Sequence, residues 1–279
     1  MIKSYCKINL SLRILNKLKS GLHNIQSNSF LLELHDNIKI KKIRKKKDII
    51  IINGPFRDLI NKDKNSITET LATLRQKKML SENSKYKINL YKNIPVFSGL
   101  GGSASNAAFI LKYLLKKKIT FQTLKMFTKR VGSDLNLFIY KQTFQKSLEN
   151  ITRYKKKFNF YFIIVYPNLK CPTKKIYSKV RNYSLPVKHN FANITSERRF
   201  ITLIKNERND LQKISTLKFT KIKKIIDFVS KQKGCYFSRM TGSGSACFGL
   251  FRNKKLASLG MKSLKKKFPR YWCVVTKTI

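Results

Sequence analysis

The chain has 279 residues and carries 61 Lys and Arg against 13 Asp and Glu, so its formal net charge is +48. Hydrophobic residues make up 42% and aromatic residues 11% of the chain, which excludes a disordered basic tail. The length suffices for one large domain or for two ordinary domains with hydrophobic cores of their own.

The first half of the chain contains both helix and strand patterns. Residues 37–41 alternate between polar and apolar side chains and residues 48–53 form a β-branched run, so both are predicted strands. Residues 65–77 have apolar side chains at helical spacing, with Ser66 as the expected N-cap. Residues 86–91 alternate again and predict another strand.

The second half repeats this mixture after a basic turn at residues 155–157. The patterns predict strands at residues 158–166, 246–251 and 272–276, and helices at residues 219–231 and 254–267. The turn suggests a domain boundary near residue 150, with an N-terminal domain at residues 1–150 and a C-terminal domain at residues 151–279. The expected fold class is α+β.

The basic excess has two interpretations. Clustered Lys and Arg bind nucleic acid or an anionic membrane surface. Alternatively the excess reflects compositional drift, because Lys, Ile and Asn are all abundant and the lysines are spread from Lys3 to Lys277. We favour drift, because no single arm concentrates the charge.

Targeting segments and metal or disulfide motifs are not evident in the sequence. The apolar stretch Tyr161–Tyr166 is far shorter than the roughly 20 residues that span a bilayer. The five cysteines are scattered without a Cys-x-x-Cys pair, and the three histidines do not cluster. We therefore expect a cytoplasmic protein without a disulfide framework, a zinc site or a membrane partner.

The segment from Pro95 to residue 108 is the most informative one. Gly99, Gly101 and Gly102 allow a ligand to approach the backbone, and a helix with one apolar face follows them. The amide groups at a helix N-terminus favour an anion, so the segment predicts a phosphate-binding loop. The plainer alternative is a glycine turn that only packs a helix on a sheet.

Two better-known phosphate motifs do not fit this segment. No Lys followed by Ser or Thr comes after the glycines, which excludes a Walker A loop. The spacing Gly99-x-Gly101-x-x-Ala104 loosely matches a dinucleotide-binding turn, but no acidic residue lies between Gly102 and Asp134 to hold a ribose.

Three further features have both a functional and a structural interpretation. The small-residue run at residues 240–247 is either part of a site or an ordinary hairpin connection. Asp134, a rare acid in this chain, is either a reactive carboxylate or a helix cap. Lys7, in an apolar strand-like stretch, is either a site residue or a strand-edge lysine.

Taken in order, these segments resemble the GHMP kinase superfamily from about residue 3 to residue 276. The features that carry the resemblance are Lys7-Ile8-Asn9, Gly21-Leu22-His23, Asn65, the loop from Pro95 to Asn106, Gly132-Ser133-Asp134, Asn209-Asp210-Leu211 and residues 240–247. Lys7-x-Asn9 followed by Gly21-x-His23 is similar to the branch that acts on 4-diphosphocytidyl-2-C-methyl-D-erythritol.

The resemblance implies a two-domain fold with a ribosomal-protein-S5-domain-2-like N-terminal domain and a ferredoxin-like C-terminal domain. It also implies that ATP, with Mg²⁺, phosphorylates the 2-hydroxyl of the cytidyl substrate in non-mevalonate isoprenoid precursor synthesis. Phosphoryl transfer needs mainly positioning and charge neutralisation, which a glycine loop, a carboxylate and a lysine supply.

The resemblance also implies roles for individual residues. Asp134 would be the general base and Lys7 its cationic partner. The implied ATP-binding residues are Asn65, Pro95, Gly99, Leu100, Gly101, Gly102, Ser103, Ala104 and Ser105, with Mg²⁺ carried by ATP and possible ligands in Ser103 or Ser105. The implied substrate-binding residues are Asn9, His23, Thr173, Tyr177, Gly242 and Gly244.

Four positions depart from the superfamily pattern. Leu22 stands where an aromatic residue is usual, Ser103 and Ala104 stand where Gly and Ser are common, and Ser133 stands where Ala is common. None of these departures removes a catalytic group, and Leu22 affects the cytidine side most.

Two alternative functions remain at this stage. One is a related kinase for homoserine or mevalonate, against which Lys7, Asn9 and His23 argue. The other is a basic nucleic-acid-binding protein, which would leave the glycine loops unexplained. We expect a small-molecule enzyme without a nucleic-acid partner, as a monomer or a weak homodimer.

Overall fold

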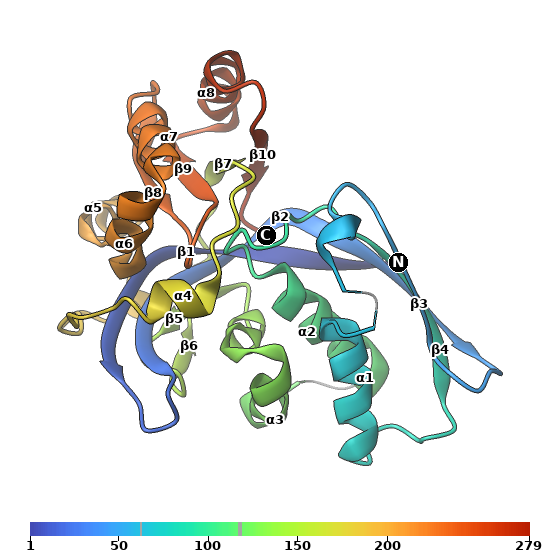
Figure 1. The fold of residues 1–279 in the computed structure, drawn as a ribbon. Coiled ribbons are helices and arrows are strands. Elements are labelled where there is room, and N and C mark those ends of the chain that lie inside the picture. The colour runs from blue at the N-terminus through green and yellow to red at the C-terminus, as the bar shows by residue number, and fades with distance from the viewer. Residues whose placement is uncertain (62, 117–118) are drawn as a thin grey trace. The chain divides into compact units, whose positions relative to one another are not determined.

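The computed structural model describes residues 1–61, 63–116 and 119–279 and contains helices and strands in mixed order (Figure 1). The strands are β1 (Ile2–Lys17), β2 (His23–Ile43), β3 (Ile49–Asn53), β4 (Lys85–Tyr91), β5 (Gln142–Gln145), β6 (Ile151–Arg153), β7 (Tyr161–Tyr166), β8 (Cys235–Met240), β9 (Cys247–Phe251) and β10 (Trp272–Lys277). The α-helices are α1 (Ser66–Gln76), α2 (Gly102–Leu115), α3 (Phe121–Val131), α4 (Thr173–Tyr177), α5 (Glu197–Asn206), α6 (Asp210–Lys218), α7 (Thr220–Ser230) and α8 (Lys254–Lys267). Short 3-10 helices are η1 (Arg57–Leu59), η2 (Ser133–Phe138) and η3 (Phe191–Asn193).

The chain forms two compact units that alternate along the sequence. Unit 1 comprises residues 1–7, 34–96 and 101–139, and unit 2 comprises residues 8–33, 97–100 and 140–279. The long strands β1 and β2 pair with each other, and each contributes residues to both units. The proposed domain boundary near residue 150 stays a prediction.

The described residues of unit 1 combine a sheet with helices α1, α2 and α3 and the short helices η1 and η2. The second half of β2 pairs antiparallel with β4, and β4 pairs parallel with β3. Helices α1, α2 and α3 lie next to one another in this unit (Figure 1). Its core consists of Ile38, Ile67, Leu71, Ile88, Leu90 and Ile110. The apolar side chains that alternate along the strands thus pack against the apolar side chains at helical spacing in α1 and α2.

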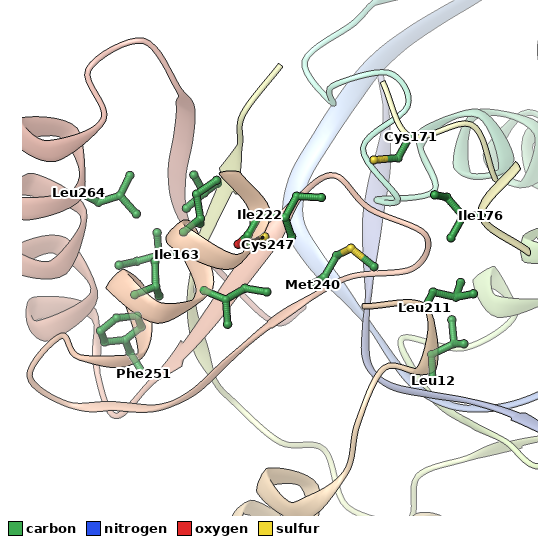
Figure 2. Packing of buried hydrophobic residues seen from close by; sticks show 14 of the residues in the cluster. Leu12, Ile163, Cys171, Ile176, Leu211, Ile222, Met240, Cys247, Phe251 and Leu264 are labelled. Atoms are coloured by element: carbon green, nitrogen blue, oxygen red, sulfur yellow. Dashed lines mark hydrogen bonds between the residues drawn. The ribbon is translucent and has the colours of Figure 1, made fainter. Parts of the chain in front are cut away.

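Unit 2 contains a four-stranded antiparallel sheet in the order β10-β7-β9-β8. Helices α7 and α8 pack against these strands (Figure 1). In the same unit the first half of β2 pairs with β5, and β5 pairs with β6. Figure 2 shows the core of this unit, in which Leu12 of β1 lies near Leu211 of α6, and Met240 and Cys247 flank the β8–β9 connection.

The structure confirms the α+β class and most of the predicted elements. Two predictions need correction. The strand expected at residues 158–166 starts at Tyr161. Helix α1 is capped by Asn65 and not by Ser66, because the Asn65 side chain accepts hydrogen bonds from the Ile67 and Thr68 amides. Within the described residues no helix is both long and apolar enough to cross a membrane.

Candidate active site

The glycine turn at the start of α2 is shaped by a lysine beneath it. Gly101 is the N-cap of α2 in the left-handed conformation, with φ of 71°, which glycine adopts readily. A Cβ atom on Gly101 would stand 2.9 Å from both Cγ and Cε of Lys7. The Lys7 side chain therefore runs directly under the turn, and a larger residue at position 101 would displace it.

Lys7 ends in an ion pair with Asp134. The Lys7 ammonium nitrogen lies 3.1 Å from Oδ2 of Asp134, the lysine side chain is 2% exposed and the aspartate side chain 42% exposed. Asp134 sits in the first turn of η2, directly after Gly132 and Ser133. The structure thus brings the two predicted catalytic residues together, with a buried cation behind a carboxylate that solvent can reach.

The two serines of the loop have different surroundings. Ser103 is exposed at the start of α2, whereas Ser105 is buried. The Ser105 hydroxyl donates to the Tyr5 carbonyl over 2.6 Å and shares a hydrogen bond of 2.7 Å with the Ser4 hydroxyl. Ser105 therefore ties α2 to β1, and Ser103 is the serine whose hydroxyl faces solvent. Ala104 is buried beside them.

Asn65 and Pro95 have structural surroundings of their own. The Asn65 amide oxygen caps α1, and its amide nitrogen donates to the Asn61 carbonyl over 3.0 Å. Pro95 is buried in the segment that leads from β4 to the glycine turn. Both residues lie in unit 1, together with Lys7, Asp134 and residues 101–105.

A second Lys–Asp pair lies beside α2, and the motif analysis missed it. The Lys92 ammonium lies 2.5 Å from Oδ2 of Asp36, and the two side chains are 2% and 0% exposed. Burial lowers the pKa of Lys92, while Asp36 opposes that change. The available signal was the alternation in β4: Ile88 and Leu90 are buried, and the same period places Lys92 on their side.

In unit 2, Gly99 packs against the β8–β9 hairpin connection. Gly99 has φ of 80°, and a Cβ atom there would collide with the Thr241 carbonyl oxygen. A Cβ atom on Gly242 would stand 3.1 Å from the Gly99 carbonyl oxygen. The Ala246 amide donates to the Ser98 carbonyl over 3.0 Å. Glycine is therefore required because two backbone segments, far apart in sequence, meet here. Leu100 is buried next to this contact.

Asn9 is held by polar groups on several sides. Its backbone amide donates to the Thr241 hydroxyl over 2.9 Å. Its side-chain nitrogen donates to the hydroxyls of Ser27 and Ser29 over 2.8 and 2.9 Å. The motif pattern pointed to Asn9 but gave no sign of these hydroxyl partners, which come from β2 and the hairpin connection.

The predicted substrate-binding residues His23, Tyr177 and Thr173 make side-chain contacts in unit 2. The rings of His23 and Tyr177 lie with centroids 5.1 Å apart and planes inclined by 37°. Burial lowers the pKa of His23, and the nearby Lys17 lowers it further, so the imidazole is neutral at pH 7. The Thr173 hydroxyl shares a hydrogen bond of 3.0 Å with the Ser243 hydroxyl, between Gly242 and Gly244. Leu22 is 51% exposed.

Comparisons with known proteins identify the family to which the chain belongs. A family model described as GHMP kinases N terminal domain matches residues 65–134, and one described as GHMP kinases C terminal matches residues 191–270. The 4-diphosphocytidyl-2-C-methyl-D-erythritol kinase of Pelagibacter ubique strain HTCC1062 is 37% identical over 100% of this chain and 98% of its own length. The enzyme of the same name from Clostridium botulinum strain Hall is 31% identical over 99% of each chain.

Solved structures show the same fold at low sequence identity. A 4-(cytidine 5'-diphospho)-2C-methyl-D-erythritol kinase aligns with a TM-score of 0.72 and 20% identity, over 99% of this chain and 98% of that one. The homoserine kinase of Cytophaga hutchinsonii aligns with a TM-score of 0.67 and 16% identity, over 100% of this chain and 96% of that one. The full-length relatives at 31% and 37% identity carry the assignment beyond the fold. The chain belongs to the GHMP kinases, a superfamily of ATP-dependent kinases, and within it to the family of 4-diphosphocytidyl-2-C-methyl-D-erythritol kinases.

Proposed function

We propose that the protein transfers the γ-phosphoryl group of ATP to the 2-hydroxyl of 4-diphosphocytidyl-2-C-methyl-D-erythritol, in non-mevalonate isoprenoid precursor synthesis. The observation that carries the proposal is the pair of Lys7 and Asp134 at 3.1 Å, with the lysine stem passing under Gly101. The full-length relatives that bear this enzyme name support the choice of substrate.

In the proposed reaction Asp134 accepts the proton of the 2-hydroxyl while that oxygen attacks the γ-phosphorus. A new phosphorus–oxygen bond forms, the bond between the γ-phosphorus and the β,γ-bridging oxygen breaks, and ADP leaves with that electron pair. The carboxylate is 42% exposed, so a substrate hydroxyl can reach it. Lys7 balances the charge that develops on the reacting oxygens.

The triphosphate would bind at the glycine turn. Backbone amides of residues 99–104 and the positive end of α2 favour an anion, with glycine at positions 99, 101 and 102 for close approach. The Ser105 amide already donates to the Gly101 carbonyl over 2.8 Å. The side chains of Leu100 and Ala104 are buried, so these residues would contribute only backbone atoms. Asn65 and Pro95 would flank the adenosine part.

The described residues fit a Mg²⁺ ion that arrives with ATP. They include no cluster of three or more His, Cys, Asp or Glu side chains, so most of the oxygen ligands would come from phosphate and water. Ser103, exposed at the start of α2, is the better-placed serine, since the Ser105 hydroxyl is committed to Tyr5. When bound, Mg²⁺ neutralises phosphate charge.

On the acceptor side, we assign cytidine recognition to His23, Tyr177, Asn9 and Thr173. The neutral imidazole of His23 offers one donor and one acceptor nitrogen to the cytosine edge, and Tyr177 offers a ring for stacking. Gly242 and Gly244 would bring hairpin backbone close to the substrate. Leu22 would supply an aliphatic surface on the remaining side.

The experiment is a coupled ADP-release assay with the cytidyl substrate, its uncytidylated phosphate analogue, homoserine and mevalonate. We expect turnover with the cytidyl substrate and at least a hundredfold lower kcat/KM with the others, because they lack the group that His23 and Tyr177 contact. A preference for an acceptor without cytidine would overturn the substrate assignment and favour the related kinases.

We further propose that the enzyme works in the cytoplasm as a monomer or weak homodimer without a nucleic-acid partner. Its lysines are dispersed along the whole sequence, and the proposed ligands are themselves anions. Light scattering at micromolar concentration tests the oligomeric state. Sub-micromolar, steeply salt-dependent binding of RNA or DNA at physiological salt would contradict the absence of a nucleic-acid partner.

A further inference from the structure

Asp36 connects Lys92 to the segment that leads into the glycine turn. One carboxylate oxygen accepts the Lys92 ammonium, and the other accepts the backbone amides of Asn93 and Ile94, each over 2.8 Å. The Lys92 backbone is also fixed, because its amide donates to the Asn53 carbonyl over 2.7 Å. The pair is therefore rigidly placed in unit 1.

Stability alone does not account for such a pair. Removing two charges from water is unfavourable, and apolar replacements of similar volume are often neutral or stabilising. Both side chains are almost fully buried, at 2% and 0% exposure. A role for the charge itself explains why a lysine and not a methionine occupies this position.

The ammonium faces the first residue of α2. A Cβ atom on Gly102 would meet the Lys92 ammonium nitrogen first, at 2.8 Å, and then two carbons of Ile94 at 3.2 and 3.4 Å. The positive end of the ion pair, and not the Asp36 carboxylate, thus points at the start of the helix. A cation beside the positive end of a helix is unfavourable by itself, and an anion bound there offsets the repulsion.

We propose that Lys92, held by Asp36, is a positioning residue for the phosphate loop. It fixes the position of the first turn of α2 and adds positive charge next to the backbone amides that bind the triphosphate of ATP. The inference rests on the proposed function. Lys92 acts through Gly102, since its side chain is 2% exposed and its ammonium is bound to Asp36.

The test is the double variant Lys92→Met/Asp36→Asn. It keeps side-chain volume, removes both charges together, and leaves an amide oxygen to accept the Asn93 and Ile94 amides. Affinity for ATP and for ADP is measured by calorimetry without acceptor substrate, next to the melting temperature, the KM for each substrate and kcat. We expect a melting temperature equal to or above that of the wild type, with ATP bound about tenfold more weakly. The KM for ATP rises in parallel, while kcat at saturating ATP and the KM for the acceptor stay close to wild type.

A matched control uses another ion pair of unit 1. Arg75 binds Asp48 over 2.7 Å, and Asp48 also accepts the backbone amide of Tyr86, as Asp36 accepts amides after β4. Arg75 belongs to the last turn of α1, at the opposite end from the N-cap Asn65. The variant Arg75→Met/Asp48→Asn should therefore leave ATP affinity unchanged. If the Lys92 variant binds ATP as well as wild type, or if both double variants lose the same affinity, the proposal is wrong.

Failure of the proposed function would look different. If the proposed function is wrong, the wild-type protein does not turn over the cytidyl substrate. The ATP affinities of variant and wild type can still be compared in that case, so the Lys92 proposal is tested separately. If Lys92→Met/Asp36→Asn does not fold, Lys92→Gln/Asp36→Asn also removes both charges and keeps a side-chain hydrogen bond between positions 92 and 36. Its ATP affinity below the melting temperature then decides: a tenfold loss supports the proposal, and wild-type affinity contradicts it.

Discussion

The two Lys–Asp pairs of unit 1 consist of the same residue types and differ in the environment of their carboxylates. Lys7 and Lys92 are both 2% exposed, and each reaches one glycine of the same turn, Gly101 and Gly102. Asp134 is 42% exposed, whereas Asp36 is fully buried and accepts two backbone amides besides its lysine. An exposed carboxylate can take a proton from a substrate, while a buried and fully hydrogen-bonded one can only hold its neighbours in place.

The largest effect should come from Asp134→Asn. The variant keeps the shape and a hydrogen bond to Lys7 but cannot accept a proton, so we expect kcat to fall by about 10³-fold. ATP affinity and melting temperature should remain near wild type, because the side chain is partly exposed. Steady-state ADP release and calorimetry measure these quantities. Substantial activity in this variant would remove Asp134 from the mechanism and erase the contrast between the pairs.

Asp36→Ala should give the opposite phenotype. It leaves a buried ammonium and the Asn93 and Ile94 amides without their carboxylate, so unfolding should become easier by about 3–5 kcal/mol. Urea unfolding monitored by circular dichroism gives this free energy. Asp134→Ala is the control, with a smaller loss of stability expected because water reaches the position of its carboxylate. Equal losses in the two variants would mean that the buried and exposed carboxylates are not energetically different.

Alanine at the two glycines should separate the pairs next. Gly101→Ala strains a residue with φ of 71° and presses on the Lys7 stem, so kcat should fall about 10²-fold. Gly102→Ala meets the end of the Lys92 side chain at 2.8 Å, and we expect mainly a rise of about tenfold in the KM for ATP. Steady-state kinetics with each substrate varied in turn distinguishes the two. Identical kcat and KM changes would contradict separate roles for the lysines.

The smallest expected effect concerns pH and provides a reference outside both pairs. Burial and Lys17 lower the pKa of His23 from its ordinary value of about 6.5, so the folded protein disfavours the protonated form. Below about pH 6.5 the unfolded chain binds the proton more readily than the folded protein, so the free energy of unfolding should decrease as the pH falls. The affinity for the cytidyl substrate should decrease by a few-fold over the same range, as His23 titrates. The KM for the acceptor, measured between pH 5 and 8, gives the acid limb of this pH profile, which His23→Asn should abolish. Persistence of the limb in that variant would assign it to another group.

The local parts of the fold and site could be predicted from sequence. The helix that follows the glycines and its apolar stripe are short-range signals, and the structure confirms both in α2. The phosphate-binding role of the glycine loop stays a prediction. The resemblance also places Lys7 beside Asp134, and the two side chains form an ion pair of 3.1 Å, while their catalytic roles stay a prediction. These features succeed because the residue types and their spacing suffice to define them.

The features that sequence reasoning missed depend on contacts between distant residues or on an apolar pattern with few members. Lys92 is one of 61 basic residues, and its partner Asp36 lies 56 positions away, so no local rule links them. Helices α3 and α5 each bury only two side chains, Leu124 with Phe127 and Phe200 with Ile204, and their exposed faces are rich in lysine and arginine. A basic background of this kind hides a narrow apolar stripe.

The central claim is that the exposed pair of Lys7 and Asp134 performs phosphoryl transfer to the cytidyl substrate. Phosphorus-31 NMR of wild-type protein with ATP, Mg²⁺ and 4-diphosphocytidyl-2-C-methyl-D-erythritol tests it most directly. We predict a new phosphomonoester resonance in equal amount to ADP, and none above background with Asp134→Asn over the same time. ADP formed without the phosphomonoester, or the same product from the variant at the wild-type rate, would contradict the account.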